Sequence, residues 1–244
     1  MSAHNPPNGM FGRFIDELEE TVIALILGAM TIITFINVVL RYGVNSQFGR
    51  WLEGLLGLDL PGGLIWGLEA TSFLFAWLVL FGISYAVKKT ANLGVDAVLN
   101  IVSTPVRRAL TLIAAAVCIG YAFLLLKGAW DYWANFANLP QTTGRWFPTG
   151  FEEMGRTSYR SWYEVIDIPM PEWLRFIEPW INEGEAYEKI PRFIPYVILP
   201  FGALLLLVRF VQATVRIWRG QSESLIVSHE AEDAVEDVAH MNKD

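Results

Sequence analysis

Four long runs of uncharged and mostly apolar residues dominate the pattern of this chain. They cover residues 21–40, 70–87, 109–126 and 193–208. Each run has close to the roughly 20 residues that an α-helix needs to cross about 30 Å of hydrocarbon. The last run is the shortest, but apolar sequence continues past Arg209 to Val215, and an arginine near a helix end can extend to the lipid headgroups. The pattern therefore predicts an all-α integral membrane protein with four transmembrane helices.

Composition and charge agree with a membrane protein and exclude other classes. The 244 residues are 53% hydrophobic and 18% charged. The mean hydropathy of +0.36 is higher than a water-soluble domain of this size needs to form one hydrophobic core. The net charge of −7, with no basic stripe interleaved with aromatic residues, argues against nucleic acid as a partner. The single cysteine, Cys118, excludes an intramolecular disulfide, a thiolate metal cluster and a CxxC redox motif.

Lysine and arginine near the span ends predict the orientation of the chain, because short cytoplasmic loops carry an excess of both. The first loop has only Arg41 and Arg50, whereas the second loop and the end of the fourth span carry a larger set. These topology-setting residues are Lys88, Lys89, Arg107, Arg108, Arg209, Arg216 and Arg219. Both groups are expected in the cytoplasm, so both termini are expected there too, and residues 129–190 are expected on the opposite side.

The loop over residues 129–190 is rich in aromatic side chains, since it holds six of the ten tryptophans. Disordered segments are poor in aromatic residues, so we expect this loop to be folded. Pro171 and Glu172 make a suitable helix start, and apolar residues then recur on one face with helical spacing. The residues on this face are Trp173, Phe176, Ile177 and Trp180.

A second amphipathic segment precedes the second span, with Arg50 and Glu53 on its polar face. Its apolar residues are Phe48, Trp51, Leu52, Leu55 and Leu56. Such a helix can lie in the plane of the membrane interface. For both amphipathic segments two interpretations stay open: an aromatic belt that anchors the protein in lipid, or a surface that docks a partner.

The spans lack the ionisable groups that proton relays, haem ligation and ion sites require. The three histidines all lie outside the spans, and no GxSxG, P-loop, HExxH or EF-hand pattern is present. The sequence therefore predicts no catalytic, substrate-binding or metal-binding residues, no cofactor and no enzyme activity. Asn37, in the first span, is expected to make an interhelical contact rather than to form part of a permeation site.

Two acidic residues close to span ends each admit two interpretations. Glu69 is either an interfacial or inter-subunit contact or an essential intramembrane carboxylate, as in small proton-coupled exporters. Its position one residue outside the second apolar run favours the interfacial role. Asp96 either caps a short helix over residues 97–103 or orders a contact with a partner.

Several short motifs follow one another in a fixed order through the middle of the chain. They are RY at 41–42, WGLE at 66–69, FLFAWLVLFG at 73–82, AVKK at 86–89 and LGVD at 93–96. Taken together, over roughly residues 20 to 130, they resemble the small membrane subunit, the DctQ-like component, of tripartite ATP-independent periplasmic (TRAP) transporters. The family often has two adjacent acids and a following arginine before its second span. This chain has Leu68 with Glu69, and Ser72, so a salt bridge to that arginine is not carried over.

The resemblance implies an accessory, non-catalytic subunit of a sodium-driven transporter in the bacterial inner membrane. In this family a periplasmic binding protein captures an organic acid, often a C4-dicarboxylate, and a large multi-span membrane subunit moves it. The small subunit is expected to form a stable heterodimer with the large subunit, to scaffold it in the lipid bilayer and to contact the binding protein transiently. The alternatives are a stand-alone proton-coupled carrier that uses Glu69, and a membrane anchor of another complex bound through residues 221–244.

We therefore expect an all-α membrane protein with interfacial amphipathic helices and a long, folded periplasmic loop. Its expected segments are a cytoplasmic N-terminal segment (1–20), four spans (21–42, 66–88, 107–128 and 191–218), a periplasmic or interfacial helix (43–65), a cytoplasmic loop (89–106), the periplasmic aromatic-rich loop (129–190) and an acidic cytoplasmic tail (219–244). The candidate interface residues are Phe48, Trp51, Leu55, Trp66, Glu69, Trp77, Asp96, Trp173, Phe176 and Trp180.

Overall fold

The computed structural model describes most of the chain. The described residues are 10–44, 46–57, 61–88, 103–137, 139–142, 144–147, 163–181 and 184–220, and the side chains at 10–18, 48, 52, 56 and 104 are not part of the description. Lys89, Asp96 and the acidic tail beyond residue 220 lie outside the described residues. The expectations for them stay predictions.

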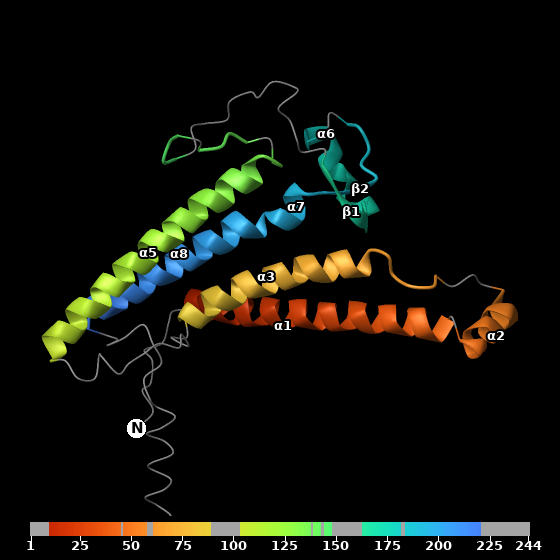
Figure 1. Ribbon diagram of the computed structural model, residues 1–244, viewed down its shortest axis with the longest axis horizontal. Coiled ribbons are helices and arrows are strands. Elements are labelled where there is room, and N and C mark those ends of the chain that lie inside the picture. Colours follow the sequence, from red (N-terminus) through yellow and green to blue (C-terminus); the bar gives the residue numbers. More distant parts are fainter. Residues whose placement is uncertain are drawn as a thin grey trace, which may run out of the picture. The chain divides into compact units, whose positions relative to one another are not determined.

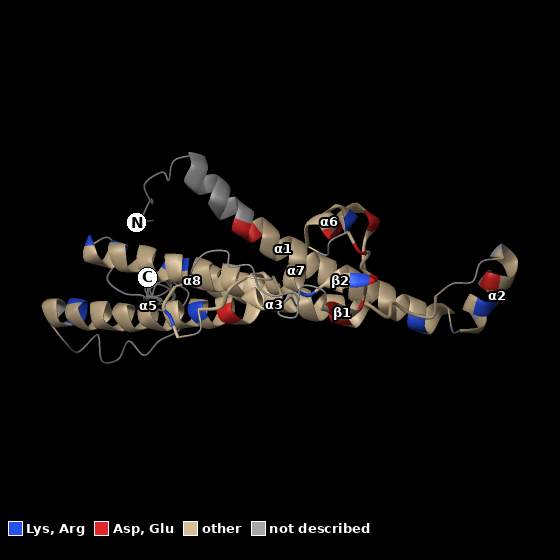
Figure 2. Cartoon of the chain, turned by 90° about the horizontal axis from the view of Figure 1, so that it is seen from above, with Lys and Arg blue, Asp and Glu red and all other residues tan. Residues whose placement is uncertain are grey.

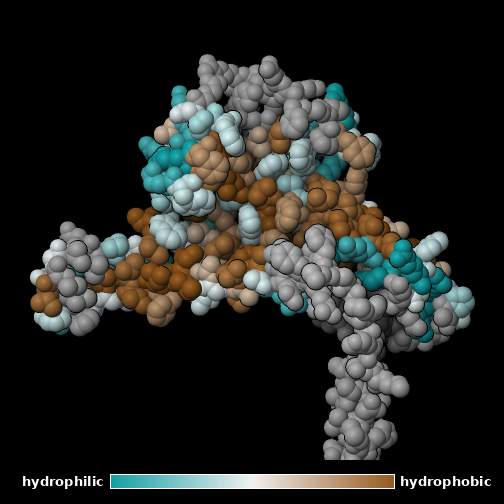
Figure 3. Space-filling view, turned by 180° about the vertical axis from the view of Figure 1, so that it is seen from behind, coloured by the Kyte–Doolittle hydropathy of each residue, from teal (hydrophilic) through white to brown (hydrophobic). Residues whose placement is uncertain are grey.

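Four helices in the described part of the chain are long and apolar enough to cross a membrane. They run over Glu19–Val44, Gly67–Lys88, Pro105–Ala134 and Phe193–Trp218. The first combines α1 (Met10–Val38) with the π-helical segment η1 (Val39–Val44), and the others are α3 (Gly67–Lys88), α5 (Thr104–Ala134) and α7 with α8 (Phe193–Tyr196 and Ile198–Trp218), as Figure 1 shows. Charged residues are few along these helices (Figure 2), and broad areas of their surface are hydrophobic (Figure 3). The prediction of a helical membrane protein with four spans is confirmed.

α5 continues past the uncharged run that ends at residue 126. Lys127 and Asp131, one helical turn apart, form an ion pair of 3.0 Å, which stabilises this part of the helix. Asp131 also accepts hydrogen bonds from both the backbone N–H and the hydroxyl of Thr142, each at 2.6 Å. The end of the helix is thereby joined to the segment that follows it.

The chain divides into two compact units, one of residues 1–81 with 127–201 and one of residues 82–126 with 202–244. In the second unit, Val87, Ala122 and Leu206 form a buried core. Further alanines are buried on the same helices, and side chains this small let membrane helices approach closely. They are Ala115 on α5 and Ala203 and Ala213 on α8.

In the first unit, η1 leads into α2 (Gln47–Leu56) through a tight turn. The Ser46 hydroxyl caps α2 by accepting a hydrogen bond of 3.0 Å from the Gly49 N–H. A Cβ atom at Gly49 would lie 2.3 Å from the carbonyl oxygen of Val44, so this turn requires glycine there. α2 ends at Gly57, whose φ of 62° is in the left-handed region that favours glycine. A helix therefore lies in the predicted amphipathic segment, and its place at the membrane interface stays a prediction.

The second part of the long loop folds into a small subdomain, residues 163–192, which we call the loop subdomain. Strand β1 (Glu164–Pro169) pairs antiparallel with β2 (Lys189–Pro191), and the register shifts along the pair as in a β-bulge. Between the strands lie the 3₁₀ helix η3 (Glu172–Ile177) and the single turn α6 (Glu178–Ile181). The core of the loop subdomain consists of Met170, Ile177 and Tyr187, with Leu174, Ile181, Ile190, Phe193 and Ile194 packed around it.

The loop subdomain differs from the sequence prediction in two respects. A two-stranded sheet is present, which the sequence did not predict. The helix predicted from Pro171 is a 3₁₀ turn followed by one α-turn, because Pro179 has no N–H to donate to the Arg175 carbonyl. In a 3₁₀ helix residues three apart align, so Ile177 lies with Leu174 in the core instead of on the predicted aromatic face.

Candidate functional site

Glu69, in the first turn of α3, binds the backbone of strand β1. Its Oε1 accepts a hydrogen bond from the Ile166 N–H at 2.8 Å, and its Oε2 accepts from Asp167 and Ile168 at 2.7 and 3.1 Å. Three consecutive N–H groups thus converge on one carboxylate, in the manner of a backbone nest. The register shift in β1 frees these groups from a regular ladder. We call this contact the Glu69 clamp, and it joins α3 directly to the loop subdomain.

Two tryptophan side chains hold the short helix α7 in the same unit. The indole N–H of Trp77 donates to the Pro195 carbonyl at 2.8 Å, and that of Trp133 donates to the Phe193 carbonyl at 2.8 Å. Indole has one donor and no other polar atom, so these bonds satisfy both half-buried side chains. Trp77, a candidate interface residue, therefore makes an internal contact. The sequence analysis did not predict this contact or the role of Trp133.

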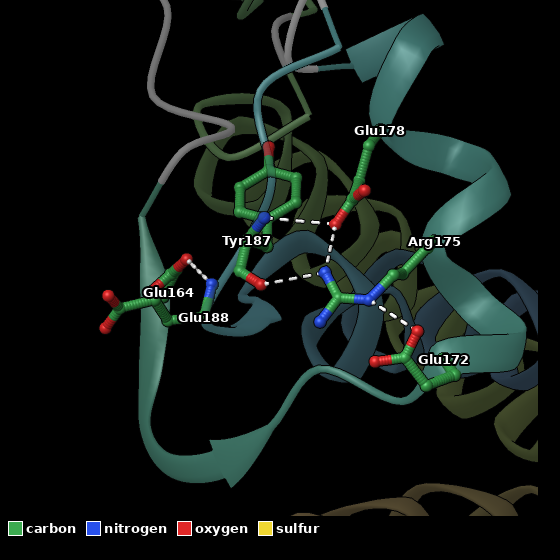
Figure 4. A network of polar contacts seen from close by, with 6 residues as sticks. All are labelled: Glu164, Glu172, Arg175, Glu178, Tyr187 and Glu188. Atoms are coloured by element: carbon green, nitrogen blue, oxygen red, sulfur yellow. Dashed lines mark hydrogen bonds and ion pairs between the residues drawn. The ribbon is translucent and has the colours of Figure 1, made fainter.

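A polar network links η3 and α6 to the segment that precedes β2, as Figure 4 shows. The Arg175 guanidinium donates to Glu172 and to the buried Glu178, each at 3.0 Å, and to the Tyr187 carbonyl at 3.4 Å. Glu178 also accepts from the Tyr187 N–H at 3.0 Å. The hydrogen bond from Arg175 to Glu172 raises the pKa of this arginine further, so its charge persists. The network fixes the two short helices against the segment that leads to β2.

Three aromatic side chains of these two short helices are largely exposed. Trp173, Phe176 and Trp180 are 75%, 60% and 81% exposed, and we call them the aromatic patch. The rings of Phe176 and Trp180 meet edge to face with centroids 6.3 Å apart. The structure thus brings these three candidate residues together on a supported surface. Large exposed aromatic clusters of this kind are typical of interaction sites.

The remaining candidate residues on the N-terminal side lie around α2 and the start of α3. Trp51 and Leu55 are one turn apart on α2, and both are exposed, at 59% and 66%. Phe48 is part of the same helix, but its side chain is not among those described. Trp66 is half-buried directly before α3, where its carbonyl accepts the N–H of Ala70 at 2.9 Å.

Asn37 contacts the segment that leads into α3. Its Oδ1 accepts the Leu64 N–H at 2.9 Å. A Cβ atom at Gly63 would lie 3.2 Å from the same oxygen, and one at Gly67 would lie 3.2 Å from Leu64. The amide in the first span therefore holds the turn before α3, which differs from the helix-to-helix contact that we expected.

Most of the topology-setting residues lie at helix ends. Lys88 ends α3, with its Nζ 5.6 Å from the ring centroid of Tyr85, and Arg107 and Arg108 lie within the first two turns of α5. Arg209 is buried within α8 and donates to Gln212 at 2.8 Å. Arg216 and Arg219 lie at the end of α8. Among the described residues, no group of three His, Cys, Asp or Glu side chains could hold a metal ion.

Comparison with known proteins identifies the family. The DctQ component of the tripartite ATP-independent periplasmic transporters matches residues 30–150. The chain is 40% identical over 225 residues to the C4-dicarboxylate TRAP transporter small permease protein DctQ of Vibrio cholerae, which covers 92% of this chain and 82% of that protein. The chain belongs to the DctQ family. It is also 30% identical over 234 residues to the DctQ protein of Pseudomonas aeruginosa, covering 91% of this chain and 93% of the relative.

As a DctQ-family protein, the chain is a small permease subunit of a TRAP transporter and a multi-pass membrane protein that works with the other TRAP components. Family membership confirms the resemblance drawn from the sequence motifs. It also confirms the prediction that the chain is a transport component and not an enzyme. The matched residues 30–150 include α2 and α3, whereas the loop subdomain with its aromatic patch lies beyond them.

Proposed function

We propose that this DctQ-family subunit is the scaffold of a sodium-driven TRAP transporter that imports C4-dicarboxylates. The substrate class is supported by the names of two relatives, from Vibrio cholerae and Pseudomonas aeruginosa, whose similarity extends over more than nine tenths of this chain. The subunit itself contributes neither the substrate site nor the sodium site. The uncharged character of the apolar runs supports this division of labour, since ion sites in membranes need polar ligands.

The first part of the proposal is a stable heterodimer with a large multi-span membrane subunit. α1 and η1 supply an apolar flank for it, because large side chains along them are exposed within this chain. These include Leu25, Ile32, Phe35, Val39 and Tyr42. In α2, Trp51 and Leu55 extend this surface, and we propose that α2 lies at the membrane interface and widens the scaffold.

The second part of the proposal is that the aromatic patch docks the periplasmic binding protein transiently. The observation that carries it is that Trp173, Phe176 and Trp180 are exposed together on a folded subdomain. Aromatic side chains of this kind dominate the binding energy of many interfaces. The polar network around Arg175 holds η3 and α6, which carry the patch, and the Glu69 clamp joins the subdomain to α3. A docking surface would thus keep a fixed position relative to a membrane helix.

The stand-alone carrier that uses Glu69 finds no support. Both carboxylate oxygens of Glu69 accept backbone hydrogen bonds within the chain, and a coupling carboxylate has to exchange its proton with solvent. Membership in a family of transporter subunits also argues against it.

The patch proposal is tested by transport in proteoliposomes that contain the large subunit and the binding protein, with and without this chain. Sodium-dependent uptake of labelled succinate should require all three proteins. Replacing Trp173, Phe176 and Trp180 together with alanine should lower uptake at limiting binding protein about tenfold or more, since truncating interface anchors commonly costs over 1 kcal/mol each.

A matched control replaces Trp146 and Phe147, an exposed aromatic pair elsewhere in the long loop, with alanine. This variant should transport normally. Co-purification of the large subunit with both variants separates docking from assembly. Unchanged uptake with the triple variant would show that the patch does not dock the binding protein.

A further inference from the structure

The start of α5 and the end of α8 meet within the second unit. The Arg108 guanidinium donates a hydrogen bond to the Trp218 carbonyl, one of the last carbonyls of α8. Arg107 precedes Arg108, and Arg216 and Arg219, three residues apart, share one side of the end of α8. We call these four arginines the cationic end. The described residues of this unit, 82–88, 103–126 and 202–220, include arginine and lysine but no aspartate or glutamate.

An exposed apolar stripe on α8 leads to the cationic end. Its residues recur every three or four positions, so they lie on one helix face. They are Leu204, Val208, Val211, Val215 and Trp218, between 40% and 69% exposed. The stripe carries no charged side chain and ends in a tryptophan, the residue that favours the boundary between hydrocarbon and headgroups.

We propose that the cationic end and this stripe form a binding site for one anionic phospholipid. The phosphate binds Arg108, Arg216 and Arg219, and an acyl chain lies along the α8 stripe. Guanidinium groups match phosphate oxygens with paired hydrogen bonds, and each juxtamembrane arginine strengthens binding to anionic lipid. Arg108 is already oriented by its bond to the Trp218 carbonyl, which lowers the cost of ordering the site.

A phospholipid fits these observations better than an acidic protein segment would. An acidic segment would bring polar side chains against the α8 stripe, whereas an acyl chain covers an uncharged stripe without leaving polar groups unpaired. The stripe and the cations are also continuous at Trp218, as headgroup and acyl chain are continuous in one lipid. This inference is independent of the proposed substrate and of docking by the aromatic patch.

Native mass spectrometry of the TRAP complex in detergent tests the site, with phosphatidylglycerol and phosphatidylcholine as the added lipids. The wild-type complex should retain phosphatidylglycerol preferentially. In the Arg216→Gln, Arg219→Gln variant the preference should fall roughly 25-fold, since each arginine contributes about fivefold. The Arg216→Lys, Arg219→Lys variant keeps the charge and should retain much of the preference, which also shows that the helix end tolerates substitution.

The control variant Arg50→Gln, Arg145→Gln removes two exposed arginines outside the second unit and should bind lipid as the wild type does. Equal phosphatidylglycerol retention by the glutamine variant would overturn the proposal. Displacement of the lipid by millimolar inorganic phosphate would also overturn it, because that result assigns the arginines to a free anion and leaves the α8 stripe without a role.

Discussion

Glu69 shows how a single carboxylate can organise backbone that is distant in the chain. Its three partners lie 97 to 99 residues away, and none of them contributes a side chain to the contact. An acidic residue in the first turn of α3 also interacts favourably with the helix dipole. The carboxylate therefore stabilises the start of a membrane helix and the bulged strand β1 at the same time.

This role predicts the effect of removing the carboxylate. In Glu69→Ala the N–H groups of residues 166–168 lose this acceptor, and a hydrogen bond to a charged group contributes about 1.5–3 kcal/mol. Hydrogen exchange at these amides should therefore accelerate about tenfold or more, while exchange within the spans stays unchanged. The control is Glu188→Ala, because the Glu188 side chain is exposed. Equal exchange at residues 166–168 in both variants would contradict a clamp.

Glu69 also marks how far the sequence could predict the candidate site. Its position at the edge of an apolar run predicted that it makes a contact. Its partners could not be predicted, because almost every residue has a backbone N–H and the sequence does not show which of them lie near a given carboxylate. Trp173, Phe176 and Trp180 were predicted to share a face from their spacing. Ile177 was assigned to that face wrongly, since the spacing was interpreted with an α-helical period and the segment is a 3₁₀ helix.

At the scale of elements, the spans were predictable because a helix that crosses a bilayer must be long enough and apolar enough to do so. Runs of uncharged residues of that length are visible in the sequence itself. Strand pairing between β1 and β2 was not predictable, since both strands are short and their contacts are non-local. The turn between η1 and α2 is a third case. Gly49 looks like an ordinary helix residue in the sequence, and only the structure shows how closely it approaches the carbonyls of η1.

Two glycines of α2 therefore give opposite predictions for the same substitution. In Gly49→Ala the new methyl group would lie 2.3 Å from the Val44 oxygen and 2.4 Å from the Gly43 oxygen, so the turn has to shift, at a cost of about 1–3 kcal/mol. In Gly54→Ala nothing lies within 4 Å, and better helix propensity should stabilise α2 by up to about 1 kcal/mol. Thermal unfolding of the purified complex should show a lower Tm for the first variant only. A lower Tm for both would mean that α2 tolerates no added bulk along its length.

At the scale of the whole molecule, charge is distributed unevenly between its parts. The described residues of the second unit carry arginine and lysine without acidic residues, whereas the loop subdomain is mainly acidic. The uneven distribution of lysine and arginine predicts that the helix ends of the second unit lie in the cytoplasm and that the loop subdomain lies in the periplasm. The same argument predicts that both termini lie in the cytoplasm, since four spans return the chain to the side on which it started.

Cysteine labelling tests this topology in cells. In a Cys118→Ala background, Trp173→Cys should react with a membrane-impermeant maleimide in intact spheroplasts, because Trp173 is exposed on the loop subdomain. Ser222→Cys, two residues past the last described residue of the chain, should react only after the membrane is permeabilised. The background without cysteine gives the blank, and retained transport shows that each variant assembles. Labelling of Ser222→Cys in intact spheroplasts would invert the topology, place the cationic end on the periplasmic side and remove the aromatic patch from reach of a periplasmic binding protein.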